Sequence, residues 1–281
     1  MEEWIYLADA HSVSNPMSHL GKPLRLRRLL GADGRGVVVP MDHGVSDGPV
    51  AGIERPSETT RKVVAGGADS VIVHKGLVRQ VGPALGKLGF WLHVSAGTAL
   101  NPDPHDKRVV ASVEEAIRLG ADGLSIHVNV GAKEESRMVE DLGRLATECD
   151  RYQLPLLAMM YPRGHEIRDP HDLTLVKKVA RLGYELGADV LKVPYTGSPE
   201  SFREVVRAVD VPVLVSGGPK TKSDRDFLTM VAGSLDAGGA GVSVGRNLWQ
   251  HADPKAMTRA VARLVHEKAS LDEALAELAK S

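Results

Sequence analysis

The feature of this sequence that most limits its possible folds is a rhythm that starts near residue 36. A short apolar segment that ends in polar residues recurs eight times by about residue 267, and segments with helical periodicity alternate with it. Strands that alternate with helices are joined by crossovers and run parallel. Eight such units in about 230 residues match a (β/α)8 TIM barrel, an α/β fold, whereas an open doubly wound sheet usually has fewer strands.

The expected strands cover residues 36–43, 70–75, 90–96, 123–130, 154–161, 190–195, 211–218 and 241–247. The expected helices cover residues 57–65, 112–119, 133–152, 173–186, 199–209, 223–237 and 253–266. Three connections, ending at residues 69, 122 and 189, contain Gly-Ala-Asp. The repetition predicts one type of turn, in which a glycine ends a helix and the chain re-enters the sheet.

The two ends of the chain lie outside this rhythm. Residues 1–35 are expected to form an N-terminal arm that closes the bottom of the barrel or reaches a neighbouring subunit, with a short helix at 24–30. Residues 36–281 are expected to form the barrel domain. It includes an extra capped C-terminal helix at 270–280, for packing or for contact within an oligomer.

Composition excludes several classes of function. The formal net charge of −1 and the isoelectric point near 6.8 give no overall field that favours nucleic acid or an anionic membrane. No apolar run approaches the roughly 20 residues of a membrane span, and the acidic N-terminus is unlike a signal peptide. The single cysteine, Cys149, cannot form an intrachain disulfide. We therefore expect a cytoplasmic protein with no membrane or nucleic-acid partner.

Lys192 lies in the middle of the apolar segment 190–193. Lysine is rarely buried, because its ammonium loses water and gains little in return. A desolvated lysine tends to lose its proton and becomes a nucleophile toward carbonyl groups. On this segment alone, a structural lysine that reaches solvent or pairs with Asp42 is equally compatible.

Polar residues follow every expected strand, at the end of a barrel where active sites lie. Lys75 is a second lysine within an apolar strand segment. Gly76 follows it directly, which places Lys75 at the rim of the barrel. Lys192 precedes three more strand residues and is expected to lie deeper, so we prefer it as the nucleophile.

The ends of the last two strands predict a phosphate site. Barrels often bind phosphate with the loops after strands 7 and 8. Glycines there let backbone N–H groups approach phosphate oxygens, and an arginine can bind phosphate in a bidentate manner. The candidate residues are Ser216, Gly217, Gly218, Gly245 and Arg246.

Four histidines on consecutive strand ends raise the alternative of a metal site, because zinc favours imidazole ligands. They are His43, His74, His93 and His127. The sequence has neither a closely spaced His-x-His pair nor a His-Glu-x-x-His segment. We therefore expect hydrogen-bonded histidines, no metal and no cofactor.

Taken together, the strand ends resemble those of the archaeal-type class I aldolases, and among them the branch of 2-amino-3,7-dideoxy-D-threo-hept-6-ulosonate synthases. The resemblance covers nearly all of residues 36–280. It rests on Met-Asp-His-Gly-Val-Ser-Asp-Gly-Pro (41–49), His-Lys-Gly (74–76), Ser-Ile-His-Val-Asn-Val-Gly (125–131), Met-Met-Tyr-Pro-Arg-Gly (159–164), Leu-Lys-Val-Pro-Tyr-Thr-Gly (191–197), Gly-Gly-Pro-Lys (217–220) and Val-Gly-Arg-Asn (244–247).

The resemblance implies a Schiff base on Lys192, a proton acceptor at Asp42 and a proton donor at Tyr161. It implies sugar-phosphate contacts from His43, Ser46, Arg163, Gly217, Gly218, Gly245 and Arg246. The activity that it implies is condensation of a phosphorylated keto sugar with L-aspartate 4-semialdehyde, on an alternative route to 3-dehydroquinate and the aromatic amino acids. It also implies a homo-oligomer, for which a decamer of ring-like pentamers is one arrangement.

Other functions remain open at this point. The enzyme could be a class I fructose-bisphosphate aldolase, or an aldolase of secondary metabolism that joins dihydroxyacetone phosphate to aspartate semialdehyde toward an aminohydroxybenzoate. Both share the lysine chemistry and differ in substrate. A metal-dependent aldolase would lose activity with a chelator. A non-catalytic sugar-phosphate binding protein would bind without turnover.

Overall fold

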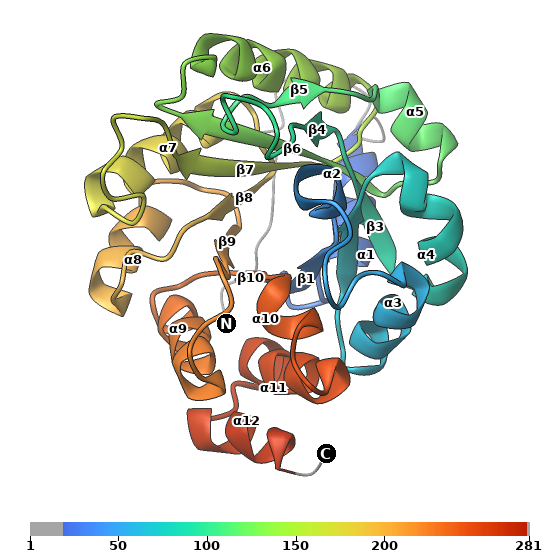
Figure 1. Ribbon diagram of the computed structural model, residues 1–281, viewed down its shortest axis with the longest axis vertical. Helices are drawn as coiled ribbons and strands as arrows, with labels where there is room; N and C mark the ends of the chain where they lie inside the picture. The colour runs from blue at the N-terminus through green and yellow to red at the C-terminus, as the bar shows by residue number, and fades with distance from the viewer. Residues whose placement is uncertain (1–18, 280–281) are drawn as a thin grey trace.

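The computed structural model describes residues 19–279 and forms a closed barrel of parallel strands (Figure 1). Around the barrel the strands follow the order β1-β10-β9-β8-β7-β6-β3-β2, and β1 closes the circle through the pairing of Val37 with Val242. The predicted (β/α)8 barrel is therefore confirmed. The strands are β1 (Gly36–Pro40), β2 (Ser70–Val73), β3 (Gly89–His93), β6 (Gly123–Val130), β7 (Leu156–Pro162), β8 (Val190–Val193), β9 (Val213–Ser216) and β10 (Gly241–Ser243).

Helices surround the barrel, and several begin where a side chain caps the first turn. Ser112, Asp172, Ser198 and Ser223 each accept a hydrogen bond from a backbone N–H of the helix that follows. The helices of the outer ring are α3 (Pro56–Ala65), α4 (Val78–Leu85), α5 (Val113–Arg118), α6 (Glu135–Arg151), α7 (Leu173–Glu185), α8 (Pro199–Val206), α9 (Asp224–Asp236) and α11 (Pro254–Glu267).

The sequence did not predict α4, which covers the crossover from β2 to β3. Gly82 and Pro83 lie inside this helix and weaken its local helical pattern. Val81, Ala84 and Leu85 are buried against the barrel, so tertiary packing holds a helix that propensity alone does not favour.

Several predicted strands extend too far toward the carboxyl end. The strand expected at 90–96 stops at His93, and Ser95–Ala96 (β4) instead pairs antiparallel with Arg108–Val109 (β5). Residues 246 and 247, expected on the last strand, lie in a short helix, Arg246–Trp249 (α10). Similarly, Gly44–Asp47 (α2) and the turn Lys75–Leu77 follow the first two strands. Val94 and Val244 follow the last residues of their strands, are fully buried and still donate backbone hydrogen bonds to Ser125 and Val38, which explains the error.

The three Gly-Ala-Asp turns have the predicted geometry. Gly67, Gly120 and Gly187 have φ angles of 97°, 80° and 92°, a region that glycine adopts without strain. The aspartate then ties the new strand to its neighbour. Asp69 accepts a hydrogen bond from the backbone N–H of Val37 at 2.6 Å, and Asp189 accepts one from Leu156 at 2.8 Å.

The N-terminal end of the barrel is closed from below. The helix Gly21–Leu29 (α1) crosses it, and Leu29 is fully buried beside Trp91. The Trp91 Nε1–H donates to Ser70 Oγ at 3.0 Å, and Ser70 in turn donates to the Leu29 carbonyl at 2.8 Å. Of the expected arm, residues 1–18 lie outside the described residues.

The C-terminal helix Leu271–Leu278 (α12) begins with a capping box between Ser270 and Glu273. It packs on α11 and α9, where Ala274 is fully buried. Between residues 19 and 279, no helix is long and apolar enough to cross a membrane.

Candidate active site

A cavity of about 260 Å³ opens at the carboxyl ends of the barrel strands. All eight strands, or the loops that follow them, contribute to its lining. The structure places every residue that the sequence predicted for the site on this lining: Asp42, His43, Ser46, Tyr161, Arg163, Lys192, Ser216, Gly217, Gly218, Gly245 and Arg246.

Lys192 lies within β8 and is only 7% exposed. The closest polar partner of its Nζ is Met159 Sδ at 3.9 Å, and no carboxylate among residues 19–279 forms an ion pair with it. Lys75 is different: it is exposed and binds Glu115 at 3.2 Å and the Val110 carbonyl at 2.9 Å. A buried amine without a salt bridge is the arrangement that a carbonyl nucleophile needs.

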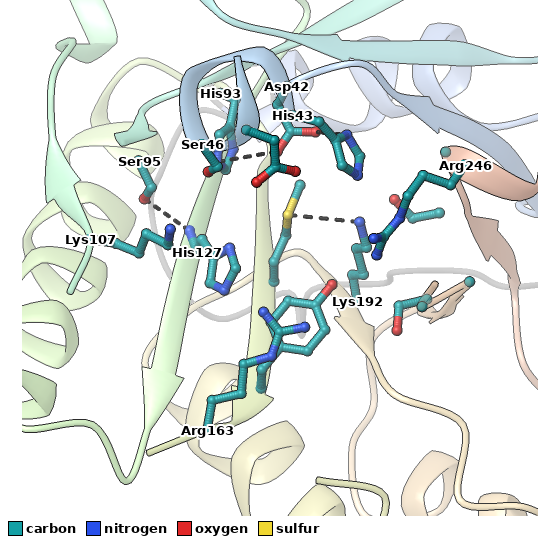
Figure 2. A pocket seen from close by; sticks show the side chains of 18 of the residues that line it. Asp42, His43, Ser46, His93, Ser95, Lys107, His127, Arg163, Lys192 and Arg246 are labelled. Atoms are coloured by element: carbon teal, nitrogen blue, oxygen red, sulfur yellow. Dashed lines mark hydrogen bonds and ion pairs between the residues drawn. The ribbon is translucent and has the colours of Figure 1, made fainter. Parts of the chain in front are cut away.

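Asp42 follows β1 and stands among imidazoles (Figure 2). Its Oδ2 lies 3.6 Å from His93 Nε2, and its Oδ1 lies 3.7 Å from His43 Nδ1. Both distances are too long for a hydrogen bond, and Oδ1 and His43 Nδ1 are buried without a partner among the described residues.

The electrostatics of this group set its protonation states. Burial alone would raise the pKa of Asp42, but the charges of His93, His43 and Lys192 outweigh it and hold the pKa well below its ordinary value. Burial also lowers the pKa of His43 and His74, and it lowers that of His93 to about 3. At neutral pH the site therefore holds an ionised carboxylate beside neutral imidazoles.

Side-chain hydrogen bonds fix two of the four histidines that were weighed as metal ligands. His93 Nδ1 lies 2.8 Å from Ser125 Oγ, and His127 Nε2 lies 2.8 Å from Asn129 Oδ1. Within the described part of the chain, no three His, Cys, Asp or Glu side chains are arranged to hold a metal ion.

Tyr161 and Arg163 leave the end of β7 as a stacked pair. The Arg163 guanidinium lies 4.1 Å from the centre of the Tyr161 ring, and the His127 ring packs against the same phenol at 4.9 Å. Tyr161 is 7% exposed, so its hydroxyl group lines the cavity from a rigid position.

The loops after β9 and β10 form the glycine-rich side of the cavity. A Cβ at Gly245 would lie 2.9 Å from the Pro40 carbonyl and 3.0 Å from His43, so only glycine allows this close approach. Arg246 Nε and Ser243 Oγ are buried and make no hydrogen bond with any described residue. Such atoms usually have partners, and an anionic ligand would supply them.

Sequence reasoning missed two contributors. Asn247 links the two glycine-rich loops, because its Nδ2 donates to the carbonyls of Gly217 and Pro219 at 3.1 and 3.2 Å. Lys107 reaches the cavity from the long connection between β4 and β5. The only sign of this in the sequence is the length and charge of residues 97–108.

Comparisons with known proteins agree with this geometry. The model of the DeoC/LacD family aldolases matches residues 36–251, most of the chain. The chain belongs to the DeoC/LacD aldolase family. Within it, the chain is an enzyme of the class I aldolase type, because its relatives include Schiff-base aldolases.

Two relatives of this aldolase are similar over nearly their full length. The 2-amino-3,7-dideoxy-D-threo-hept-6-ulosonate synthase of Halobacterium salinarum is 43% identical, with 92% of this chain and 97% of the relative aligned. The 2-amino-4,5-dihydroxy-6-oxo-7-(phosphonooxy)heptanoate synthase of Streptomyces griseus is 40% identical, with 89% and 92% aligned.

Among solved structures, a Schiff-base-forming fructose-1,6-bisphosphate aldolase superposes with a TM-score of 0.81 at 35% identity, covering 86% of this chain and 99% of that one. An archaeal fructose-1,6-bisphosphate aldolase gives a TM-score of 0.78 at 34% identity, covering 86% of this chain and 98% of that one. Its catalytic lysine is bound covalently to a carbinolamine intermediate.

Proposed function

We propose that this aldolase joins a phosphorylated ketone donor to L-aspartate 4-semialdehyde, with Lys192 as the residue that forms the Schiff base. The observation that carries the proposal is the buried Lys192 amine, which forms no salt bridge with residues 19–279. It lines a cavity whose glycine-rich side holds donors without a partner among the same residues. The names of the two relatives support the acceptor, because both describe a seven-carbon product with a 2-amino group.

The reaction begins with the donor. Arg246 and the backbone at Gly217, Gly218 and Gly245 bind the phosphate and hold the ketone near Lys192. The neutral amine of Lys192 attacks the carbonyl carbon, and the resulting carbinolamine loses water to give an iminium ion. The iminium accepts the electron pair of an adjacent bond, which yields an enamine: a C–H bond releases its proton to a base, and a C–C bond of a longer ketose phosphate releases an aldehyde fragment.

The enamine carbon then attacks the aldehyde carbon of the acceptor, and the aldehyde oxygen takes up a proton. Tyr161 is the proposed proton donor to oxygen, and Asp42 is the proposed proton acceptor during formation and hydrolysis of the imine. Water releases the product and restores Lys192. Asp42 is ionised at neutral pH and can therefore accept a proton, which its lowered pKa makes it release again readily.

Borohydride reduction in the presence of a phosphorylated ketone tests the nucleophile. Wild-type protein is expected to gain one donor-sized mass on the peptide that contains Lys192, and Lys192→Met is expected to gain none and to lose turnover. Lys75→Met removes an exposed lysine at the rim and is the matched control, with adduct and turnover retained. An active Lys192→Met protein without an adduct would sink the proposal.

A second donor is favoured by one specific observation. The name of the Streptomyces griseus relative describes a product that keeps a 7-phosphonooxy group and a 6-oxo group, as expected if dihydroxyacetone phosphate were the donor. Turnover of aspartate semialdehyde with dihydroxyacetone phosphate, compared with turnover using longer ketose phosphates, decides between primary and secondary metabolism.

The proposal extends to the setting of the enzyme. With a longer ketose phosphate as donor, the product would enter a route to the aromatic amino acids in the cytoplasm. We also propose a homo-oligomer, to which α12 at the surface could contribute. Gel filtration with light scattering measures its size.

A further inference from the structure

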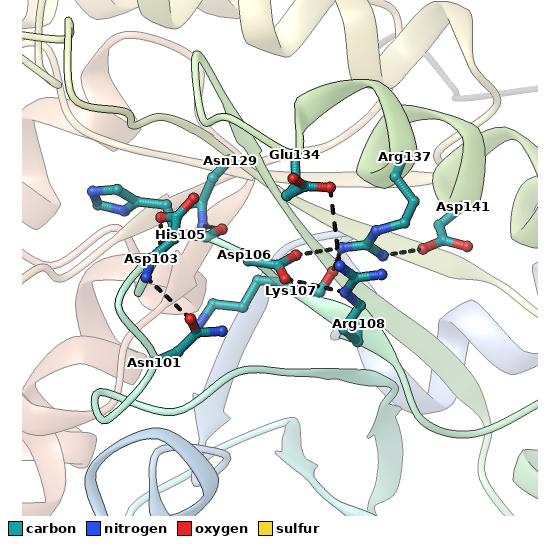
Figure 3. Close-up of polar contacts among 10 residues, drawn as sticks. All are labelled: Asn101, Asp103, His105, Asp106, Lys107, Arg108, Asn129, Glu134, Arg137 and Asp141. Atoms are coloured by element: carbon teal, nitrogen blue, oxygen red, sulfur yellow. Dashed lines mark hydrogen bonds and ion pairs between the residues drawn. The ribbon is translucent and has the colours of Figure 1, made fainter.

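The connection between β4 and β5 lies over the mouth of the barrel and brings Lys107 into the cavity (Figures 2 and 3). It is attached to the rim at several points. Ser46 Oγ donates to the Gly97 carbonyl at 2.9 Å, and the Ala99 N–H donates to the Ser46 carbonyl at 3.0 Å. Asn129 Nδ2 donates to the His105 carbonyl at 2.7 Å. The loop is therefore a fixed part of the cavity wall.

Arg137, from α6, holds the end of this loop (Figure 3). Its guanidinium forms an ion pair with the buried Asp106 and donates to the Lys107 carbonyl at 2.7 Å. Asp141 in turn binds Arg137 at 3.1 Å, and Arg108 binds Asp106 at the same distance. This network fixes the main chain from which the Lys107 side chain starts.

Lys107 and Arg163 place two cations on the same side of the cavity, and the described residues give neither an ion pair. Among the described residues the Lys107 ammonium donates to one acceptor, the Gly97 carbonyl at 3.3 Å, and Arg163 contacts the face of Tyr161. Burial and the charge of Arg163 lower the pKa of Lys107, and the charges of Asp42, Asp47 and Asp106 partly offset this. Two adjacent cations without a counter-ion favour an anionic ligand.

His127 stands between these cations in Figure 2 and adds an acceptor to them. Burial, Arg163 and Lys107 keep its pKa well below the ordinary value, so the ring is neutral. Asn129 Nδ2 donates to the His105 carbonyl, so the amide oxygen of Asn129 faces His127 Nε2. Because this oxygen can only accept, the single ring proton of the neutral imidazole lies on Nε2. The His127 Nδ1 lone pair therefore remains available as an acceptor.

Two cations beside a neutral acceptor fit one end of an α-amino acid better than a phosphate. The carboxylate of an α-amino acid matches the planar fork of the Arg163 guanidinium. The α-ammonium next to that carboxylate can donate a hydrogen bond to the Nδ1 lone pair of His127. A phosphate dianion has no hydrogen to offer His127. The glycine-rich side, which suits phosphate, includes Arg246. In Figure 2, Arg246 lies on one side of Lys192, and Lys107 and His127 lie on the other.

We propose that Lys107 and Arg163 bind the carboxylate, and His127 Nδ1 the ammonium, of the α-amino acid end of the aldehyde acceptor, with Arg137 as the positioning residue for Lys107. This assignment rests on the proposed function for its substrate. It makes the loop between β4 and β5 the element that selects the acceptor, while the glycine-rich loops select the donor.

The test compares Lys107→Met with the rim control Lys75→Met in steady-state kinetics. Lys107→Met is expected to raise the KM for aspartate semialdehyde by about tenfold to a hundredfold, the loss expected for one charged hydrogen bond. The KM for the donor and the borohydride adduct on Lys192 are expected to stay unchanged. An unchanged acceptor KM would overturn the assignment. So would an equal rise with uncharged glyceraldehyde, or a larger rise with glyceraldehyde 3-phosphate.

Arg137→Met tests the positioning role. It is expected to raise the acceptor KM by about threefold to tenfold with the donor KM unchanged, and Arg137→Lys is expected to restore part of the loss. A variant that raises both KM values equally would show a general structural effect and would contradict positioning.

Calorimetric titration with L-2-aminobutyrate, which has the amino acid end but no aldehyde, separates this inference from the proposed function. Binding to the wild type that is lost in Lys107→Met supports the subsite. If the same wild-type protein forms no borohydride adduct, the proposed chemistry of Lys192 is wrong but the subsite still stands. Equal binding to both proteins, or binding to neither, overturns the subsite.

Discussion

At the N-terminal end of the barrel, charged side chains close to the strands have partners. Arg28 binds Asp122 at 2.6 Å, and Lys22 binds Asp189 at 3.0 Å. His266 bridges two carboxylates, with Nδ1 3.0 Å from Asp33 and Nε2 3.0 Å from Asp69. At the C-terminal mouth, by contrast, buried polar atoms lack partners among the described residues. They include Asp42 Oδ1, His43 Nδ1, Ser243 Oγ and Arg246 Nε.

The difference separates stability from function. A buried polar atom without a partner costs free energy of folding, so its presence calls for a ligand that will complete it. The paired charges at the other end contribute to folding and do not line this cavity. Substitutions at the mouth should therefore change activity with little loss of stability, and substitutions at the closed end should do the reverse.

The largest expected effect is that of Asp42→Asn. Loss of the proposed base should lower kcat by about 10²-fold to 10⁴-fold, while the melting temperature should change little, because asparagine keeps the volume and shape of the side chain. Assay and thermal melting of the same preparation measure both. A kcat within tenfold of wild type, or a clear fall in melting temperature, would break the comparison at this end.

Asp189→Ala makes the opposite test. It leaves the Lys22 ammonium with a weaker partner and leaves the Leu156 N–H without its acceptor. The free energy of unfolding should fall by about 2–4 kcal/mol, with KM and kcat unchanged. Asp150→Ala is the matched control, since Asp150 binds the same lysine at 3.4 Å from an exposed position. It should cost less than about 1 kcal/mol in urea unfolding.

His266 makes the closed end sensitive to pH. Its hydrogen bond to Asp69, and then that to Asp33, raise its pKa from 6.5 to about 9. Because the folded-state pKa lies above the unfolded value, protonation stabilises the fold fully below about pH 6.5 and this contribution is lost as the pH rises through about 9. The free energy of unfolding below about pH 6.5 should exceed that above about pH 9 by roughly 1–2 kcal/mol. His266→Gln should remove that difference; an equal pH dependence in the variant would contradict the assignment.

The smallest effect is expected at the rim, outside both regions. Glu115→Gln removes the exposed ion pair with Lys75. Such pairs contribute about 0.2–1 kcal/mol, so both stability and turnover should stay close to wild type. A large change in turnover would mean that Lys75 takes part in the site after all.

The convergence of Lys192, Asp42 and Tyr161 could be predicted from the sequence because topology alone determines it. Once parallel strands close into a barrel, residues at their carboxyl ends must meet, whatever their exact register. The strand ends themselves were less predictable. Buried residues such as Val94 and Val244 continue the apolar pattern, and even the backbone hydrogen bonds to the neighbouring strand, past the last residue of their own strands.

Lys107 shows what local pattern cannot supply. Its place in the cavity depends on Arg137, which is 30 residues away in sequence and belongs to another element. A contact of this kind leaves no periodic signal. The helix α4 was hidden for a different reason: Gly82 and Pro83 oppose it locally, and burial against the barrel decides the outcome.

The charges on the cavity lining have a consequence for how fast substrates arrive. Among the described lining residues, the cations Lys107, Arg163 and Arg246 face two carboxylates, Asp42 and Asp47, in a chain whose formal net charge is −1. The mouth is thus a local well of positive potential in a slightly acidic molecule. Field lines focused by such a cleft speed the encounter with anions. Diffusional capture of phosphorylated substrates should therefore slow as ionic strength rises and the screening length contracts toward about 8 Å.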